Sequence, residues 1–289
     1  MILGPTASGK SDLAVKIAKK FNGEVISADS RQVYKGLDIG TGKITKKEMG
    51  EVPHHLLNVA NLKRKFTVVQ YRKLALKAID KILKKDKIPI LCGGTGFYIQ
   101  AVIDGILIPT VKPDWKLRKK LEKKSAKELY KILKKLDPRR AKTIEKENPR
   151  RLIRAIEIVM KTKKPVPSLK KNPLPYPVLI LGIKKQDKEL KNLIKKRFLK
   201  WLKMGLIAEV KKLRKSGFSW KKIEEFGLHY QVIAQYLQEK LIYQKMIENS
   251  LNELENYAKR QMTWFKKDRR ILWVKNYQQA EKKFGRFLR

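Results

Sequence analysis

Gly4-Pro5-Thr6-Ala7-Ser8-Gly9-Lys10-Ser11 is the stretch that decides the fold. It matches the pattern G-x-x-x-x-G-K-[ST], in which a glycine-containing loop follows a strand and opens a helix. Met1 to Leu3 supply the apolar end of a strand, and residues 10–21 carry apolar side chains at helical spacing. We therefore predict that all eight residues form a phosphate-binding loop. Backbone N–H groups of residues 7–10 would surround phosphate oxygens, Lys10 would add a cation, and the Ser11 hydroxyl would bind Mg²⁺.

Strand-like and helix-like segments alternate downstream of this loop. The predicted strands are residues 24–29, 54–59, 88–92, 178–183 and 271–274, and the clearest predicted helix is 67–83. The alternation is typical of an α/β fold, here a P-loop NTPase-like parallel sheet flanked by helices. Lysine-rich helical segments dominate after Pro113. We expect a P-loop α/β core in residues 1–112, a basic helical lid or insertion in 113–177, and in 178–289 a core strand followed by helices that return to the core.

The charge balance points to a polyanionic partner. The chain has 70 Lys and Arg against 27 Asp and Glu, a formal net charge of +43. Such a surface attracts nucleic acid. Most of these residues are lysines, so a genome's base composition is an alternative cause, with the lysines on solvated helix faces. A chain that is 42% hydrophobic can still bury a core.

Membrane and disulfide-stabilised classes are not indicated. No apolar run approaches the length of a membrane span, and Cys92 is the single cysteine. The loop begins at residue 4, so we expect no targeting segment before it, no membrane association and a cytoplasmic location.

The residues that end the predicted strands narrow the chemistry. Most loops of this kind bind ATP or GTP, and a second strand then ends in an Asp that holds the metal. Here the strand 88–92 ends in Gly93-Gly94-Thr95, so the loop could hold a diphosphate that is not part of a nucleotide. Asp29 ends the strand 24–29 at the same edge of the sheet. A metal ligand, a proton acceptor and a simple turn residue all stay open as roles for Asp29.

Six segments in order carry a family resemblance. They are the loop 4–11, the stretch 29–43 (DSRQVYKGLDIGTGK), Pro53-His54-His55-Leu56, the stretch 93–98 (GGTGFY), the stretch 148–157 (NPRRLIRAIE) and the stretch 259–265 (KRQMTWF). Together they resemble the tRNA dimethylallyltransferases over almost the whole chain, in the compact bacterial form that lacks a zinc finger. The resemblance implies transfer of a dimethylallyl group from dimethylallyl diphosphate to N6 of adenosine-37, beside the anticodon of tRNAs that read codons beginning with U.

The resemblance also assigns roles to residues. Asp29 would be the general base that accepts the proton of the attacking amine, and Thr95 would steady the reacting centre. The loop 4–11, with Mg²⁺ at Ser11, would stabilise the leaving diphosphate. The insertion and the C-terminal helices would bind the anticodon stem-loop of the tRNA. The expected tRNA contacts are Asp29, Ser30, Arg31, Gln32, Arg118, Arg150, Arg151, Leu152, Ile153 and Arg154.

Two other functions stay open from the residues alone. A P-loop small-molecule kinase would use the loop for ATP, and a non-catalytic RNA-binding protein would need only the positive charge. His229, in Gly227-Leu228-His229-Tyr230, departs from the family pattern, and we expect it to be structural. We expect the enzyme to act as a monomer.

Overall fold

The computed structural model covers residues 1–289 and describes all of them except 108, 110 and 169. The chain divides into two compact units, one formed by Met1–Ile103 with Leu174–Arg289 and the other by Asp104–Pro173. This division rests on packing. The sequence predicted three regions, 1–112, 113–177 and 178–289, and gave each a functional role. That functional division stays a prediction.

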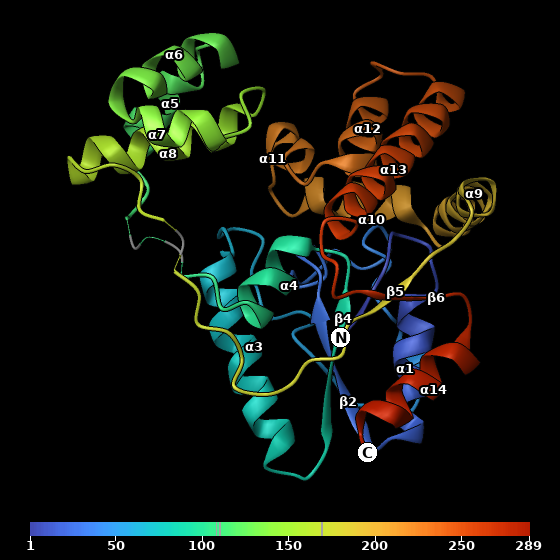
Figure 1. The fold of residues 1–289 in the computed structure, drawn as a ribbon. Helices are drawn as coiled ribbons and strands as arrows, with labels where there is room; N and C mark the ends of the chain where they lie inside the picture. Colours follow the sequence, from blue (N-terminus) through green and yellow to red (C-terminus); the bar gives the residue numbers. More distant parts are fainter. Residues whose placement is uncertain (108, 110, 169) are drawn as a thin grey trace. The chain divides into compact units, whose positions relative to one another are not determined.

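A six-stranded parallel sheet forms the centre of the first unit (Figure 1). Its strand order is β3-β2-β4-β1-β5-β6. The strands are β1 (Ile2–Leu3), β2 (Gly23–Ala28), β3 (His54–His55), β4 (Ile88–Gly93), β5 (Leu181–Ile183) and β6 (Leu272–Val274). The predicted fold class, a P-loop-type parallel sheet flanked by helices, is confirmed.

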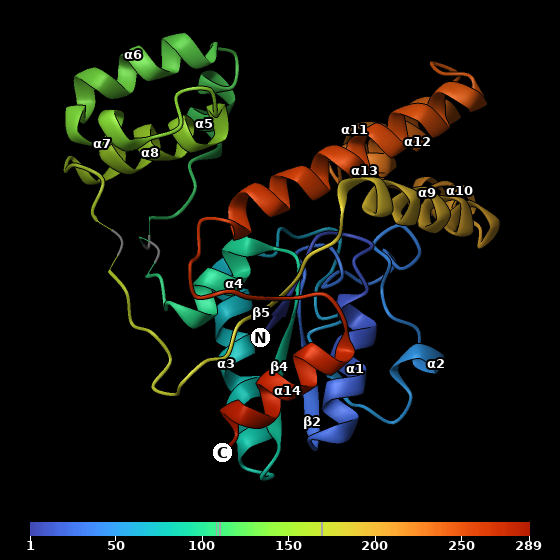
Figure 2. The same cartoon turned by 45° about the vertical axis from the view of Figure 1, so that its right-hand side comes forward.

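Helices cover both faces of this sheet (Figure 1 and Figure 2). They are α1 (Lys10–Lys20) and α14 (Tyr277–Phe287) on one face and α3 (Val68–Leu83) and α4 (Gly96–Ile103) on the other, with the short α2 (Lys46–Met49) in a connection. Neighbouring strand residues face opposite layers: Val25 packs with the α1 side and Ile26 with the α3 side. This alternation explains why the strands are apolar at consecutive positions.

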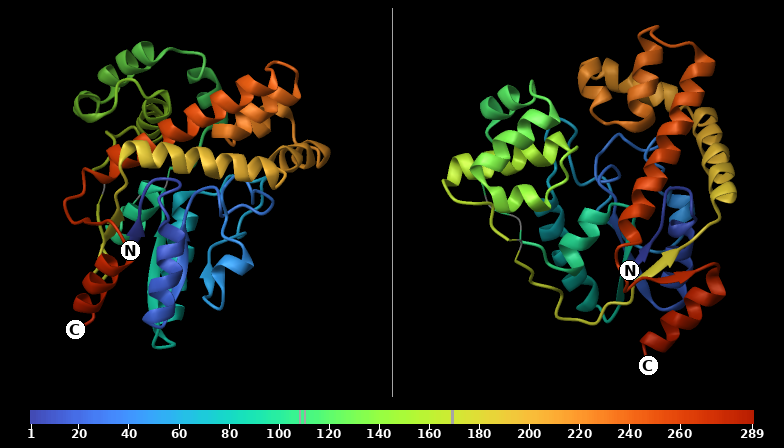
Figure 3. Two further views of the ribbon diagram at one scale, coloured as in Figure 1. Left: turned by 90° about the vertical axis from the view of Figure 1, so that its right-hand side faces the viewer. Right: turned by 45° about the horizontal axis from the view of Figure 1, so that its top comes forward.

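A second helical layer lies over the carboxyl ends of the strands. It consists of α9 (Asp187–Lys203), α10 (Leu206–Lys215), α11 (Trp220–Glu224), α12 (Leu228–Leu237) and α13 (Tyr243–Phe265). These helices have their own apolar core, in which Phe198, Leu206 and Ile233 are fully buried. Figure 3 shows α9 crossing above the end of the sheet to which the phosphate loop belongs.

The second compact unit is a small helical bundle. Its helices are α5 (Trp115–Leu121), α6 (Ala126–Leu136), α7 (Pro138–Thr143) and α8 (Pro149–Thr162). Leu129, Leu133, Leu152 and Ile156 form the centre of its core. Side chains of Ser125 and Asn148 cap the starts of α6 and α8, as their positions before helical patterns indicate.

Two predicted strands are shorter than expected, for local reasons. The segment 54–59 is a strand only at His54–His55, because Leu56 and Asn58 have positive φ angles of 63° and 58° and turn the chain. The segment 178–183 begins its strand at Leu181, because its neighbour β1 offers only Ile2 and Leu3 for pairing.

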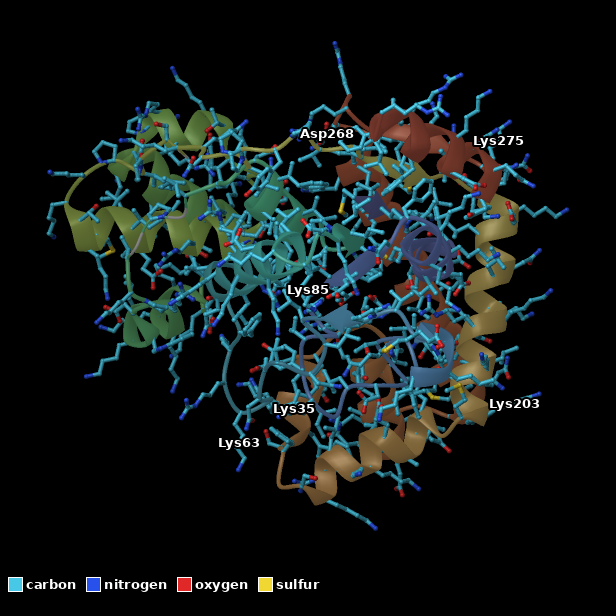
Figure 4. All side chains as sticks on the ribbon, turned by 90° about the horizontal axis from the view of Figure 1, so that it is seen from below. Lys35, Lys63, Lys85, Lys203, Asp268 and Lys275 are labelled. Atoms are coloured by element: carbon cyan, nitrogen blue, oxygen red, sulfur yellow. The ribbon has the colours of Figure 1, made fainter. Side chains whose placement is uncertain are left out.

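Most of the excess positive charge lies on the surface. Lys35, Lys63, Lys203 and Lys275 are exposed, and Figure 4 shows lysine side chains extending from the ribbon. In the described residues, no helix is both long and apolar enough to cross a membrane.

Candidate active site

The phosphate loop connects β1 to α1 at the carboxyl edge of the sheet. Ala7 has a φ angle of 62°, unusual for a residue with a side chain, so the loop is held in a strained turn. The first turn of α1 leaves its initial N–H groups without intrahelical partners, and these groups face the position a phosphate would take. The Ser8 hydroxyl is buried and has no hydrogen-bond partner among the described residues. An anion in the loop would satisfy the free N–H groups of this first turn.

Lys10 supplies the cation of the loop. Its Nζ donates to the Pro5 carbonyl at 3.1 Å, which holds the side chain back over the loop. Burial lowers the pKa of Lys10, and the positive charge of Arg197 lowers it further. A bound diphosphate would pair with the ammonium group and so favour its charged form.

Asp29 follows β2 directly and shapes the turn after the strand. Its Oδ1 accepts hydrogen bonds from the N–H of Arg31 at 2.8 Å and from the N–H of Gln32 at 3.3 Å. In the described part of the chain no donor reaches Oδ2. One carboxylate oxygen is thus fixed by the turn, while the other is available to a substrate.

Thr95 lies beside this turn, after β4. Its Oγ1 accepts the N–H of Ser30 at 3.0 Å and donates to the Ser30 hydroxyl at 3.4 Å. The Tyr257 side chain of α13 lies beside Thr95, and burial raises the pKa of the Tyr257 phenol. Thr95 therefore contacts the residue next to Asp29, and it joins the turn to α13.

A loop at residues 38–43 forms another wall of the site. The carboxylate of Glu209, on α10, accepts the N–H groups of Asp38 at 2.9 Å, Ile39 at 2.7 Å and Gly40 at 3.1 Å. The Tyr230 hydroxyl donates to the same carboxylate at 2.6 Å. Three consecutive backbone donors on one carboxylate fix the loop firmly against the helical layer.

The same loop connects Gln32 to a cation, Arg197, that no sequence motif indicates. The Gln32 Nε2 donates to the carbonyls of Thr41 at 3.3 Å and Gly42 at 3.2 Å, and Arg197 of α9 donates to Gly42 at 3.1 Å. The guanidinium carbon of Arg197 lies 4.9 Å from the centroid of the Trp201 ring. Burial lowers the pKa of Arg197, although its lowered value is no obstacle to a charged guanidinium at neutral pH.

These elements enclose one cavity of about 510 Å³. It brings together most of the predicted residues: Thr6, Ala7, Ser8, Gly9, Lys10 and Ser11 of the loop, with Asp29, Arg31 and Gln32. Gly4 and Pro5 are buried behind the loop. Ser30 and Thr95 do not line the cavity, but they support the turn that does.

His229 also lines this cavity. Burial lowers its pKa to about 4, so the imidazole is neutral at physiological pH. The ring centroid lies 5.3 Å from that of Trp201 and 5.0 Å from that of Tyr230. This aromatic packing agrees with the structural role expected for His229.

The remaining predicted RNA contacts belong to the helical bundle of residues 104–173. Arg118 donates to the two oxygens of Glu157 at 2.8 and 2.7 Å, and Arg154 pairs with the same carboxylate. Glu157 has no exposed surface. Burial alone would raise its pKa, but hydrogen bonds from Arg118, the Asp114 N–H and Arg154 outweigh burial and lower the pKa to about 2.

The stretch 150–154 therefore does not present one uniform surface. Arg150 and Arg151 are exposed, and Arg151 pairs with Glu145 at 3.1 Å. Leu152 and Ile153 are buried in the core of the bundle, so their side chains have no surface to offer to RNA. Any contact of these two residues with tRNA would have to come from the backbone, and it stays a prediction.

Comparisons with known proteins identify the family of this chain. The IPP transferase family model matches residues 32–268. The chain belongs to the IPP transferase family. This confirms the predicted family resemblance. A tRNA dimethylallyltransferase from Acetivibrio thermocellus is 41% identical over 95% of this chain and 90% of its own length. A second relative, tRNA dimethylallyltransferase 2 from Treponema denticola, is 42% identical over 92% of this chain and 91% of its own length.

Solved structures of IPP transferases share the fold. The tRNA isopentenylpyrophosphate transferase from Bacillus halodurans superposes with a TM-score of 0.74 at 34% identity, covering 99% of this chain and 94% of that chain. A eukaryotic dimethylallyltransferase, solved acting on tRNA, gives a TM-score of 0.75 at 28% identity over 96% of this chain and 74% of its own.

Three contributors to the site come from helices far along the chain. Arg197 lies on α9, and Tyr257 and Gln261 lie on α13. Only Gln261 had a local signal, since it falls in the stretch 259–265 that resembles a family motif. Among 16 arginines, nothing in the sequence alone distinguishes Arg197 as the one that reaches the cavity.

Proposed function

We propose that this chain transfers the dimethylallyl group of dimethylallyl diphosphate to N6 of adenosine-37 in the anticodon loop of tRNAs that read codons beginning with U. The observation that carries the proposal is a single cavity that holds both a phosphate loop and the carboxylate of Asp29. A phosphate loop alone would serve any nucleotide enzyme. A carboxylate with a free oxygen in the same cavity supplies the proton acceptor that an exocyclic amine needs.

The reaction balances with these residues. The lone pair of N6 attacks C1 of the dimethylallyl group, the new C–N bond forms, and the bond between C1 and the diphosphate oxygen breaks. Oδ2 of Asp29 takes the proton that N6 loses, and inorganic diphosphate leaves with the electron pair of the broken bond. Negative charge grows on that oxygen in the transition state, and in this proposal the loop N–H groups stabilise it together with Lys10 and Arg197, which line the cavity.

Mg²⁺ fits the residues of the loop. Ser11 offers a hydroxyl oxygen, and Mg²⁺ takes substrate phosphate oxygens and waters for its other positions. The described residues contain no cluster of three or more His, Cys, Asp or Glu side chains that could hold a metal, so the diphosphate would supply most of the non-water ligands. When bound, the ion would neutralise part of the charge of the leaving group.

The target base must leave the stacked loop to reach Asp29. Arg31 and Gln32 follow Asp29 in the same turn and line the cavity, and in this proposal they contact the flipped adenosine or its neighbours. The exposed Arg150 and Arg151 would bind phosphates of the anticodon stem. A cytoplasmic location and a monomeric state stay predictions.

A mass measurement tests this proposal. The protein is incubated with dimethylallyl diphosphate, Mg²⁺ and a synthetic anticodon stem-loop that carries adenosine at position 37. We expect a mass gain of one C5 unit on that RNA, and none on a matched RNA with guanosine at position 37. Parallel reactions with ATP in place of dimethylallyl diphosphate test the kinase alternative. The absence of a C5 product with every adenosine-37 RNA, from protein shown to be folded, would contradict the proposal.

A further inference from the structure

The stretch 259–265 has no part in the chemistry described above, yet one of its side chains lies between two loops of the site. Gln261 is 6% exposed and projects from α13. Its Oε1 accepts the N–H of Thr6, in the phosphate loop, at 2.8 Å. Its Nε2 donates to the carbonyl of Gly94, in the loop after β4, at 2.9 Å. A single amide group thus bridges the loop that would hold the diphosphate and the loop that carries Thr95.

The bridge needs the chemistry of an amide. The Thr6 contact requires an acceptor and the Gly94 contact a donor, and a buried group that loses either partner is left unsatisfied. The packing is close as well. A Cβ atom on Gly94 would lie 2.1 Å from the Gln261 Nε2, so a side chain at position 94 would displace the amide.

The contacts continue from Gly94 to Asp29. Tyr257 lies one turn before Gln261 on the same face of α13, with its side chain beside Thr95. Thr95 accepts the N–H of Ser30 at 3.0 Å, and Ser30 is bonded directly to Asp29. One face of α13 therefore contacts the leaving-group loop through Gln261 and the general-base turn through Tyr257 and Thr95.

We propose that Gln261 is a positioning residue that sets the separation between the phosphate loop and Asp29. The inference rests on the proposed function, because only there do the two loops hold the two ends of one reacting system. Transfer requires the amine, C1 and the leaving oxygen to be aligned, and a small displacement of one end relative to the other lowers the rate. Both polar atoms of the Gln261 side chain are bonded to backbone atoms of the two loops. Gln261 acts through Thr6 and Gly94.

Gln261→Glu tests the inference with a change of one atom. Glutamate keeps an oxygen for the Thr6 N–H, but when ionised it turns a second oxygen toward the Gly94 carbonyl. When protonated, it donates to that carbonyl and restores the bridge. We expect kcat near the wild-type value at low pH, and a loss of about 10- to 100-fold as pH rises and the glutamate ionises. KM for dimethylallyl diphosphate should change less than kcat, because the Thr6 contact is kept.

The matched control is Asn256→Asp, which makes the same amide-to-carboxylate change at an exposed position of α13. It should show the wild-type pH profile. If Gln261 has only a structural role, less of the variant will fold, but the folded fraction will show the wild-type dependence of kcat on pH. If kcat of Gln261→Glu depends on pH in the same way as kcat of the wild type, the inference is overturned. Failure of the wild type to transfer any C5 unit would instead contradict the proposed function.

If Gln261→Glu does not fold, Tyr257→Phe supplies the second test. It removes one hydroxyl and keeps the ring in place, so it breaks the contact with Thr95 and leaves the Gln261 bridge. The positioning model expects kcat to fall about tenfold, with KM for dimethylallyl diphosphate unchanged. A wild-type kcat in this variant would overturn the model of α13 as the element that sets the two loops.

Discussion

Asp29→Asn separates the proposed chemical role of Asp29 from its structural role. The asparagine side-chain oxygen can still accept the N–H groups of Arg31 and Gln32, which lie 2.8 and 3.3 Å from Oδ1 in the wild type. Weakening two such bonds from charge-assisted to neutral should cost about 1 to 2 kcal/mol of stability. The neutral amide cannot accept a proton. We therefore expect a folded protein that binds dimethylallyl diphosphate but transfers its prenyl group slowly.

The magnitude follows from general-base catalysis. Removing a positioned base lowers a rate by about 10²- to 10⁴-fold, which is about 3 to 5 kcal/mol in the barrier. The rate should be measured in single turnover at saturating dimethylallyl diphosphate, because product release then does not mask the chemical step. Circular dichroism during thermal unfolding would confirm that the variant is folded.

Asp38→Asn is the matched control, because Asp38 lines the same cavity and pairs with Lys43 at 2.5 Å. It removes one negative charge from the cavity without touching the turn at Asp29. If Asp29→Asn stays within tenfold of the wild type, a barrier change of only about 1.4 kcal/mol, Asp29 is not the general base. An equal loss in Asp38→Asn would show that the rate depends on cavity charge and not on proton transfer.

Three further predictions concern the cations and the helical bundle. Lys10→Ala should raise KM for dimethylallyl diphosphate by about 10- to 100-fold, from the loss of a charge-assisted contact, and titration calorimetry with the diphosphate alone would show a similar loss in affinity. Glu157→Gln should destabilise the bundle by about 3 kcal/mol, because two arginines lose their buried carboxylate. In the wild type the pKa of Glu157 is about 2 against an ordinary 4.5, so its contribution is present above about pH 4.5 and is lost as pH falls toward 2, which helical circular dichroism against pH would follow. Equal denaturation midpoints for the wild type and Glu157→Gln at neutral pH would speak against this role. For Arg150→Ala we expect the slope of log K against log salt in tRNA binding to fall by about 1, and an unchanged slope would exclude Arg150 from phosphate contact.

Local sequence signals predicted the parts of the site that depend on the chain near them. The phosphate loop and the turn at Asp29 follow strand ends, and the carboxyl ends of parallel strands meet at one edge of a sheet. Arg197 and Tyr257 could not be assigned in this way. Their positions depend on how α9 and α13 pack over that edge, and helical periodicity reveals only which face of a helix is apolar. The pairing of Arg118 with Glu157 was missed for the same reason, since 39 residues separate them.

The packing also accounts for the missing acidic residue after β4. A Cβ atom on Gly93 would lie 2.2 Å from the Ala28 carbonyl, and one on Gly94 would meet the Gln261 amide. An Asp at either position would push apart β2 and β4 or displace Gln261 from the two loops it joins. In this fold α13 therefore approaches through the space in which many P-loop enzymes hold a metal-binding carboxylate. The proposed function explains why a helix takes the place of this carboxylate. The phosphate loop has to release a diphosphate while Asp29 stays aligned with the reacting centre, and α13 contacts both the phosphate loop and the loop that carries Thr95.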